Sequence, residues 1–226
     1  MRLLLWDIDG TLLSTSGAGI RALEASMAAE FNSGNPVDLS DIDWAGRTDR
    51  WIARTIFEKY GVEHTSANVN RLLNGYLERL PRHLEELTRA LPGVREILAE
   101  ADKRSDIVQG LLTGNLARGA ATKLSHFDLW DYFPFGAFSD DSAVRNDLGP
   151  YALERAATHS GHTFDPRDVW IIGDTPRDIE CGKVIGARTL AVATGHHSMR
   201  ELQQHAPDQA VANFEVTDSF WEIVTS

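Results

Sequence analysis

The feature that most constrains this sequence is a pair of acidic residues directly after an apolar run near the amino terminus. Leu3–Trp6 is apolar, and Asp7 and Asp9 follow it, with Gly10 next in the chain. The run predicts a buried strand, and open α/β sheets place their chemistry at the carboxyl ends of strands. One carboxylate can act there as a nucleophile and the other as an acid. The alternative is a turn or a calcium loop, but no glutamate follows at the calcium-loop spacing.

A second apolar run ends at a short polar segment. Ile107–Leu112 predicts another buried strand, and Thr113, Gly114 and Asn115 follow it. This segment supplies the hydroxyl of Thr113, the backbone amide of Gly114 and the side-chain amide of Asn115, which together can bind phosphate oxygens. A strand-end threonine can also be a helix cap, so the segment alone does not determine a function.

A third apolar run leads into two more acidic residues. Val169–Gly173 predicts a strand, and Asp174 and Asp178 follow it. Pro176 lies between them and suits the first turn of a helix. The four-residue spacing lets the two carboxylates share a face.

In their order and their position after apolar strands, these motifs resemble the haloacid dehalogenase-like hydrolase superfamily, in its phosphoglycolate phosphatase-like branch. Asp7 and Asp9 correspond to the first motif of that family, Thr113 to the second, and Asp174 and Asp178 to the fourth. The resemblance covers most of the chain. It implies an α/β fold with a doubly wound, Rossmann-like parallel sheet and an inserted α-helical cap.

The pattern along the chain agrees with this organisation. Residues 17–87 are expected to be almost entirely helical and to form the cap, whereas residues 1–16 and 88–226 are expected to form the hydrolase core. Apolar strands and helical patterns alternate through the core, as in a doubly wound sheet. Residues 208–226 predict a last short strand and helix.

The third family motif is where this chain departs from the pattern. The family usually has a Lys-Pro pair before a helix, and no such pair occurs here. Arg145 is the nearest cation before the helix-like segment Tyr151–Ala157, so we expect it to take the place of the lysine and to bind phosphate oxygens. The alternative is a solvated loop arginine. Lys123 is a second candidate, although its helix places it on the expected solvent-facing side.

A segment of the expected cap also resembles one that related enzymes direct at the substrate. Arg47 lies in this Gly-Arg-Thr sequence and is a candidate for binding the phosphoryl group or another anionic part of the substrate. The alternative is a helix amino terminus, in which Thr48 or Asp49 caps the following helix.

The resemblance implies a mechanism. Asp7 attacks phosphorus to form an aspartyl-phosphate, and Asp9 first protonates the leaving group and then activates water. Asp7, the backbone carbonyl of Asp9 and Asp174 hold Mg²⁺, and Asp178 orients its waters.

The resemblance implies that four groups bind the non-bridging oxygens of the phosphoryl group, three from the second motif and one from the segment that corresponds to the third. These are the Thr113 hydroxyl, the Gly114 amide, the Asn115 side chain and Arg145. The resulting expectation is a magnesium-dependent phosphatase acting on a small phosphomonoester, phosphoglycolate-like or a sugar phosphate.

Three alternatives remain open. A haloacid dehalogenase needs neither Asp9 nor the metal ligand Asp174, which argues against it. A sugar-phosphate mutase keeps both acids and is harder to exclude. A catalytically weak metabolite-binding module would bind metal and ligand without turnover.

Composition limits the partners that can be expected. The 226 residues carry a formal net charge of −11, with no basic stripe for nucleic acid or an anionic membrane. Cys181 is the only cysteine, which excludes an internal disulfide and suits a reducing compartment. With no transmembrane-like span, we expect a cytoplasmic monomer or homodimer. The physiological substrate is not identified by the sequence.

Overall fold

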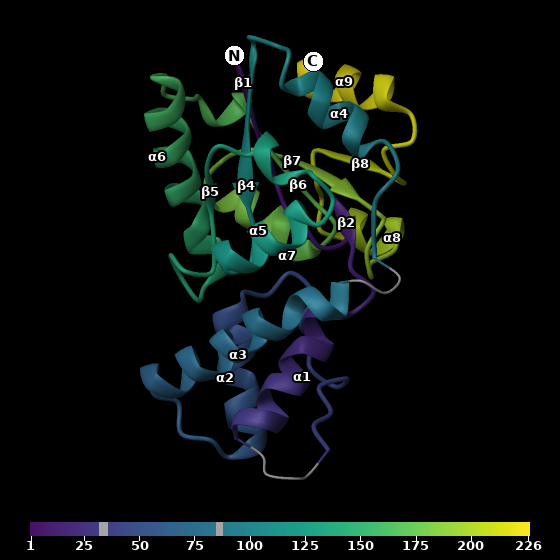
Figure 1. Cartoon of the computed structure of the whole chain (residues 1–226). Helices are drawn as coiled ribbons and strands as arrows, with labels where there is room; N and C mark the ends of the chain where they lie inside the picture. The colour runs from purple at the N-terminus through teal and green to yellow at the C-terminus, as the bar shows by residue number, and fades with distance from the viewer. Residues whose placement is uncertain (32–35, 85–87) are drawn as a thin grey trace.

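The computed structural model describes residues 1–31, 36–84 and 88–226, and its centre is a six-stranded sheet (Figure 1). The strand order is β5-β4-β1-β6-β7-β8, and every neighbouring pair is parallel. This confirms the predicted α/β class. The strands are β1 (Arg2–Trp6), β4 (Ile107–Leu112), β5 (Gly136–Ala137), β6 (Val169–Gly173), β7 (Arg188–Val192) and β8 (Gln209–Val211).

Helices cover both faces of this sheet, as the doubly wound prediction requires. Alternate side chains of β1 point to opposite faces. Leu4 and Trp6 join a cluster with α4, α5 and α9, and Leu3 and Leu5 join one with α6 and α7. The helices of the sheet domain are α4 (Val94–Ala101), α5 (Ala117–Ser125), α6 (Leu148–Ser160), α7 (Pro176–Val184), α8 (Met199–Gln204) and α9 (Thr217–Thr225).

A separate group of three helices lies beyond the carboxyl ends of the strands and has a hydrophobic cluster of its own (Figure 1). Residues of this helical unit and of the strand ends together line one cavity, described below. In the described part of the chain, no helix is long and apolar enough to cross a membrane. The three helices are α1 (Ala18–Glu30), α2 (Asp49–Tyr60) and α3 (Ser66–Leu84).

The chain passes between sheet and helical unit through a short two-stranded ribbon. β2 (Leu13–Ser14) pairs antiparallel with β3 (Arg89–Ala90). This ribbon lies near both expected crossings. The exact domain boundaries, 17–87 for the cap and the remainder for the core, stay a prediction.

The expectation of an almost entirely helical cap is too broad. Residues 36–48 form turns and irregular backbone instead. Asp38 accepts a hydrogen bond from the backbone of Ser40 at 2.9 Å, a local side-chain bond that competes with helix formation.

The amino terminus of α2 docks on the loop that follows β4. The Asp49 backbone N–H donates to Gly114 O at 2.7 Å, and the Leu116 N–H donates to Asp49 Oδ2 at 2.7 Å. Thr48 caps α2 by accepting from Trp51 N, and its hydroxyl donates to the backbone of the loop before η2, the 3₁₀ turn Arg145–Asp147. Burial raises the pKa of Asp49 to about 6, against the opposing effect of the Lys123 charge.

This pKa predicts a pH-dependent effect of Asp49→Asn. The unfolded carboxyl ionises near 3.8 and the folded one near 6, so the folded state holds the proton longer and wild type loses stability as pH rises through this window. Asparagine keeps the acceptor for Leu116 N–H and cannot ionise. The free energy of unfolding of Asp49→Asn relative to wild type should therefore rise by roughly 1–2 kcal/mol between pH 5 and pH 7.5, measured by urea denaturation. A difference that does not change with pH would contradict the raised pKa.

Candidate active site

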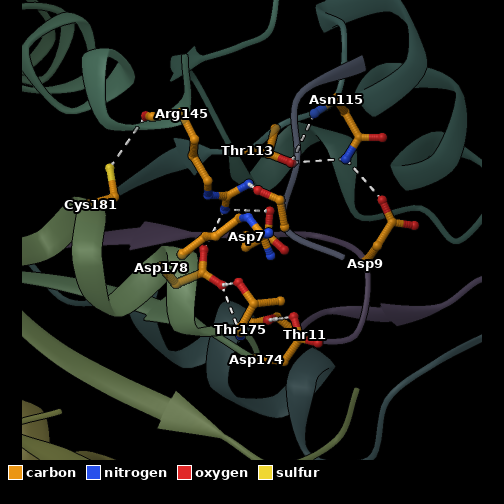
Figure 2. Close-up of polar contacts among 12 residues, drawn as sticks. Asp7, Asp9, Thr11, Thr113, Asn115, Arg145, Asp174, Thr175, Asp178 and Cys181 are labelled. Carbon is orange, nitrogen blue, oxygen red and sulfur yellow. Dashed lines mark hydrogen bonds and ion pairs between the residues drawn. The ribbon is translucent and has the colours of Figure 1, made fainter. Parts of the chain in front are cut away.

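Polar residues that follow three adjacent strands meet at one edge of the sheet (Figure 2). Asp7 directly follows β1, Thr113 follows β4 and Asp174 follows β6, and β1 pairs with both of the others. Because the strands are parallel, their carboxyl ends lie together, as the sequence predicts. All three side chains are buried.

An acidic cluster forms at the centre of this edge. Carboxylate oxygens of Asp7, Asp174 and Asp178 lie within 4.8 Å of one another. The sequence assigns only the backbone carbonyl of Asp9 to the metal site, and the Asp9 side chain is turned toward Asn115 on the other side of Asp7 (Figure 2). The cluster therefore offers three carboxylates, and any contribution of Asp9 to it would come from the backbone, as predicted.

Asp174 occupies a cradle formed by two glycines. A Cβ atom on Gly10 would lie 2.3 Å from Asp174 Oδ2, and one on Gly195 would lie 1.6 Å from the same oxygen. The Thr11 hydroxyl donates a hydrogen bond to Asp174 Oδ1 at 3.3 Å. Burial, together with the charges of Asp7 and Asp178, raises the pKa of Asp174 well above its usual value. Buried oxygens with so little hydrogen bonding fit a hard divalent cation.

Asp178 is held from within the protein. It is the third residue of α7, where it completes a capping box with Thr175. Its Oδ2 accepts from Thr175 N at 3.0 Å and from the Thr175 hydroxyl at 2.7 Å, and its Oδ1 accepts from Arg145. With both oxygens engaged, Asp178 is less available to a metal ion than Asp174 is.

Arg145 lies in the acidic cluster rather than in solvent. The residue is 7% exposed. Its Nη2 donates to Asp7 Oδ1 at 3.1 Å and to Asp178, and its Nη1 donates to Gly46 O at 3.2 Å. This geometry contradicts the alternative of a solvated loop arginine. Burial raises the pKa of Asp7 to about 6, although Arg145 acts in the opposite direction.

Lys123 does not lie on a solvent-facing side of its helix, and that expectation was wrong. The residue is 4% exposed, and its Nζ donates to Asp9 Oδ2 and to Asn115 Oδ1, each at 2.6 Å. α5 packs against α3 of the helical unit, so the polar face of α5 is covered. Burial opposes ionisation of Asp9, but the Lys123 charge and the hydrogen bonds from Lys123, Asn115 and Thr15 lower its pKa overall.

The Thr113–Asn115 segment is arranged by hydrogen bonds of its own. Asn115 Nδ2 donates to Thr113 Oγ1 at 2.8 Å and to Asp9 Oδ2 at 2.9 Å. At Gly114 an added Cβ would lie 2.1 Å from the backbone oxygen of Arg47, so only glycine allows the helical unit to approach this closely.

Arg47 lines the same cavity from the helical unit. Its guanidinium lies 4.0 Å from the centre of the Trp51 ring, and its Nη2 is 3.9 Å from Asp43. Thr48 caps α2, as the alternative of a helix amino terminus predicts. The predicted contact of Arg47 with substrate stays a prediction.

The cavity has a volume of about 480 Å³ and lies between the strand ends and the helical unit. At one side, the rings of Trp44 and His196 pack edge to face with centroids 4.7 Å apart. Local sequence patterns do not predict this contact, because Trp44 and His196 lie 152 positions apart in the chain.

Comparisons with known proteins identify the family of this chain. The family model described as haloacid dehalogenase-like hydrolase matches residues 4–192. An N-acetylmuramic acid 6-phosphate phosphatase from Pseudomonas aeruginosa is 30% identical, over 87% of this chain and 83% of that protein. A phosphoglycolate phosphatase from Synechococcus elongatus is 26% identical, over 92% and 91%.

Solved structures with the same fold include a hydrolase from Pseudomonas syringae, with a TM-score of 0.77, 19% identity and full coverage of both chains. A β-phosphoglucomutase candidate from Thermotoga maritima has a TM-score of 0.67 and 21% identity, and the match covers 99% of this chain and 100% of that one. The family prediction and the prediction of a phosphatase are confirmed by the family model and the curated relatives.

The glycine cradle predicts that Gly195→Ala weakens divalent-metal binding. The added methyl would collide with Asp174 Oδ2 and displace the carboxylate. We expect Mn²⁺ affinity, measured by calorimetric titration, to fall roughly 10–100-fold, the scale of losing support for a metal ligand.

Asp174→Ala should lower the affinity at least as much, and Asp178→Ala less. Gly161→Ala is the control for an added methyl group far from the cavity, because a Cβ there meets nothing within 4 Å; its left-handed φ of +68° should lower stability without changing metal affinity. Wild-type affinity in Gly195→Ala would contradict a metal site at Asp174.

Proposed function

Because the chain belongs to the haloacid dehalogenase-like hydrolase family, we propose that it is a Mg²⁺-dependent phosphatase that hydrolyses a small phosphomonoester through an aspartyl-phosphate on Asp7. The observation that supports this most directly is the position of Asp7. It lines the cavity, belongs to the acidic cluster, and is bonded by Arg145 on one oxygen only. Among the described residues, no side chain donates a hydrogen bond to its other oxygen, which is available for attack.

The residues present fit a magnesium site. Asp7 and Asp174, with the backbone carbonyl of Asp9, would hold the ion directly, and Asp178 would orient its waters because both its oxygens are already engaged. When bound, the ion supplies positive charge that offsets the clustered carboxylates and favours the ionised form of Asp7.

The reaction has two chemical steps. A carboxylate oxygen of Asp7 attacks phosphorus, the P–O bond to the leaving group breaks, and Asp9 gives its proton to the leaving oxygen. Asp9 then takes a proton from water, the water oxygen attacks phosphorus, and the bond to Asp7 breaks to release inorganic phosphate.

Lys123 and Asn115 favour the ionised form of Asp9 before substrate binds. The acid role therefore requires substrate to change the surroundings of Asp9. A phosphate dianion beside Asp9 does so, because a nearby like charge raises the pKa of a carboxyl group.

The transferring oxygens would be bound by the groups gathered around Asp7. We assign the Gly114 amide, Asn115 and Arg145 to the non-bridging oxygens, with Thr113 behind Asn115 as a further donor, and Arg47 to the entrance of the cavity. Preorganised donors of this kind stabilise the charge that develops in the transition state.

The partner is a small phosphorylated metabolite rather than nucleic acid, and the protein acts as a monomer or homodimer. A sugar-phosphate mutase is the second candidate, because it also uses an aspartyl-phosphate. Phosphate release distinguishes the two, since a mutase returns the phosphoryl group to the sugar.

Asp7→Asn tests the nucleophile. The amide nearly matches the carboxylate in shape but is a poor nucleophile, so release of inorganic phosphate from p-nitrophenyl phosphate should fall below detection with the thermal unfolding midpoint little changed. Wild type without Mg²⁺ should also be inactive. Most of the wild-type rate in folded Asp7→Asn would rule out the aspartyl-phosphate route.

Arg145→Ala tests the cation. Loss of a preorganised electrostatic contact should lower kcat/KM on the order of 10²-fold or more. Arg145→Lys should restore only part of the lost kcat/KM. One ammonium cannot reproduce the contacts of a two-pronged guanidinium to Asp7, Asp178 and Gly46.

Arg155→Ala is the matched arginine control, since Arg155 pairs with Asp141 away from the cavity. Equal kcat/KM values for Arg145→Ala and wild type would contradict a role for Arg145 in the reaction.

A further inference from the structure

The cavity extends well past the groups that would hold a phosphoryl group. At about 480 Å³ it falls in the range of pockets that bind drug-sized ligands. The side chains of Ile20, Leu23 and Ile52 line its helical-unit wall and give it an apolar face. A two-carbon leaving group such as glycolate would leave this wall without contacts.

Tyr76 places an unpartnered hydroxyl in this wall. It belongs to α3, is 1% exposed and lines the cavity. Within the part of the chain that the structure describes, no residue hydrogen-bonds to its hydroxyl, whereas buried tyrosine hydroxyls usually have a partner. Burial raises the pKa of Tyr76 well above its usual value, so the hydroxyl remains a neutral donor.

Lys123 reaches the same place from the sheet side. A Cβ atom on Gly19 would lie 3.8 Å from Lys123 Nζ and 4.0 Å from the Tyr76 hydroxyl. The absence of a side chain at Gly19 therefore keeps a space open beside both polar groups. All three residues line the cavity.

The charge around this space selects against a carboxylate. Lys123 is already paired with Asp9. The carboxylate of Asp49 also lies close enough to interact electrostatically with Lys123 and with Asp9. With one ammonium and two carboxylates, the surroundings of the Tyr76 hydroxyl carry no excess positive charge. A neutral hydroxyl can accept from Tyr76 there, whereas a carboxylate next to the phosphate ester would be repelled.

We propose that Tyr76 and Lys123 form a second polar subsite, which binds a hydroxyl group of a sugar-like leaving alcohol while Ile20, Leu23 and Ile52 contact its carbon skeleton. This proposal rests on the proposed phosphatase function and narrows its substrate class. It favours polyhydroxylated phosphomonoesters over phosphoglycolate.

The kinetic test compares glucose 6-phosphate, phosphoglycolate and p-nitrophenyl phosphate with Mg²⁺. Wild type should have a higher kcat/KM for glucose 6-phosphate than for phosphoglycolate. Tyr76→Phe removes only the hydroxyl and should lower the ratio of kcat/KM for glucose 6-phosphate to that for p-nitrophenyl phosphate about 5–10-fold, the scale of one buried hydrogen bond. Tyr60→Phe is the matched control, because the Tyr60 hydroxyl bonds to Asp38 outside the cavity.

A binding test separates the subsite from catalysis. In the Asp7→Asn background, Tyr76→Phe should lower the binding affinity for glucose 6-phosphate more than that for inorganic phosphate, as measured by calorimetry. Wild type inactive on all three esters would overturn the proposed function, and the binding test would still decide the subsite. A preference for phosphoglycolate, or equal losses for both ligands in Tyr76→Phe, would overturn the subsite.

Discussion

Three buried carboxylates and one guanidinium are gathered at the centre of this structure. Asp7, Asp174 and Asp178 lie within reach of one metal ion, and Arg145 is the cation bonded to two of them. If all three ionise, two negative charges remain in excess, which is why burial and mutual repulsion raise the pKa of Asp174 so far. The sheet makes this arrangement unavoidable, because the two strands that end at Asp7 and Asp174 are parallel neighbours. A divalent ion matches the excess charge.

The same guanidinium also connects the acidic cluster to the helical unit. Arg145 donates to Gly46 O, and the loop after β4 exchanges hydrogen bonds with Asp49 at the start of α2. Separating the helical unit from the sheet would break these contacts at the reaction centre itself. Access to the cavity and the electrostatics around Asp7 therefore depend on each other. A bound substrate that accepts hydrogen bonds from Arg145 would replace some of the hydrogen bonds lost when the helical unit separates from the sheet.

The sequence predicted those site residues whose position follows from the strands. Apolar runs mark buried parallel strands, and Asp7, Thr113 and Asp174 follow the ends of such runs, so their meeting at one edge was predictable. Lys123 was misjudged because helical periodicity distinguishes polar from apolar faces but does not show what covers a polar face. Its burial depends on α3, which ends 39 positions earlier in the chain, and the partner of His196 lies 152 positions away. Such contacts arise only once the helical unit has folded over the sheet edge.

The missing Lys-Pro pair does not leave the site without positive charge, because two cations divide the region between them. Arg145 lies against Asp7 and Asp178, and Lys123 lies against Asp9 and Asn115. Their chemistry fits their places: a planar fork can bond two carboxylates and a carbonyl at once, whereas a flexible ammonium suits a single carboxylate and an amide oxygen. Lys123 is therefore no substitute for Arg145. Lys123 contacts the carboxylate that we propose exchanges protons, and Arg145 contacts the carboxylate that we propose attacks phosphorus, so the two proposed roles depend on separate charges in this chain.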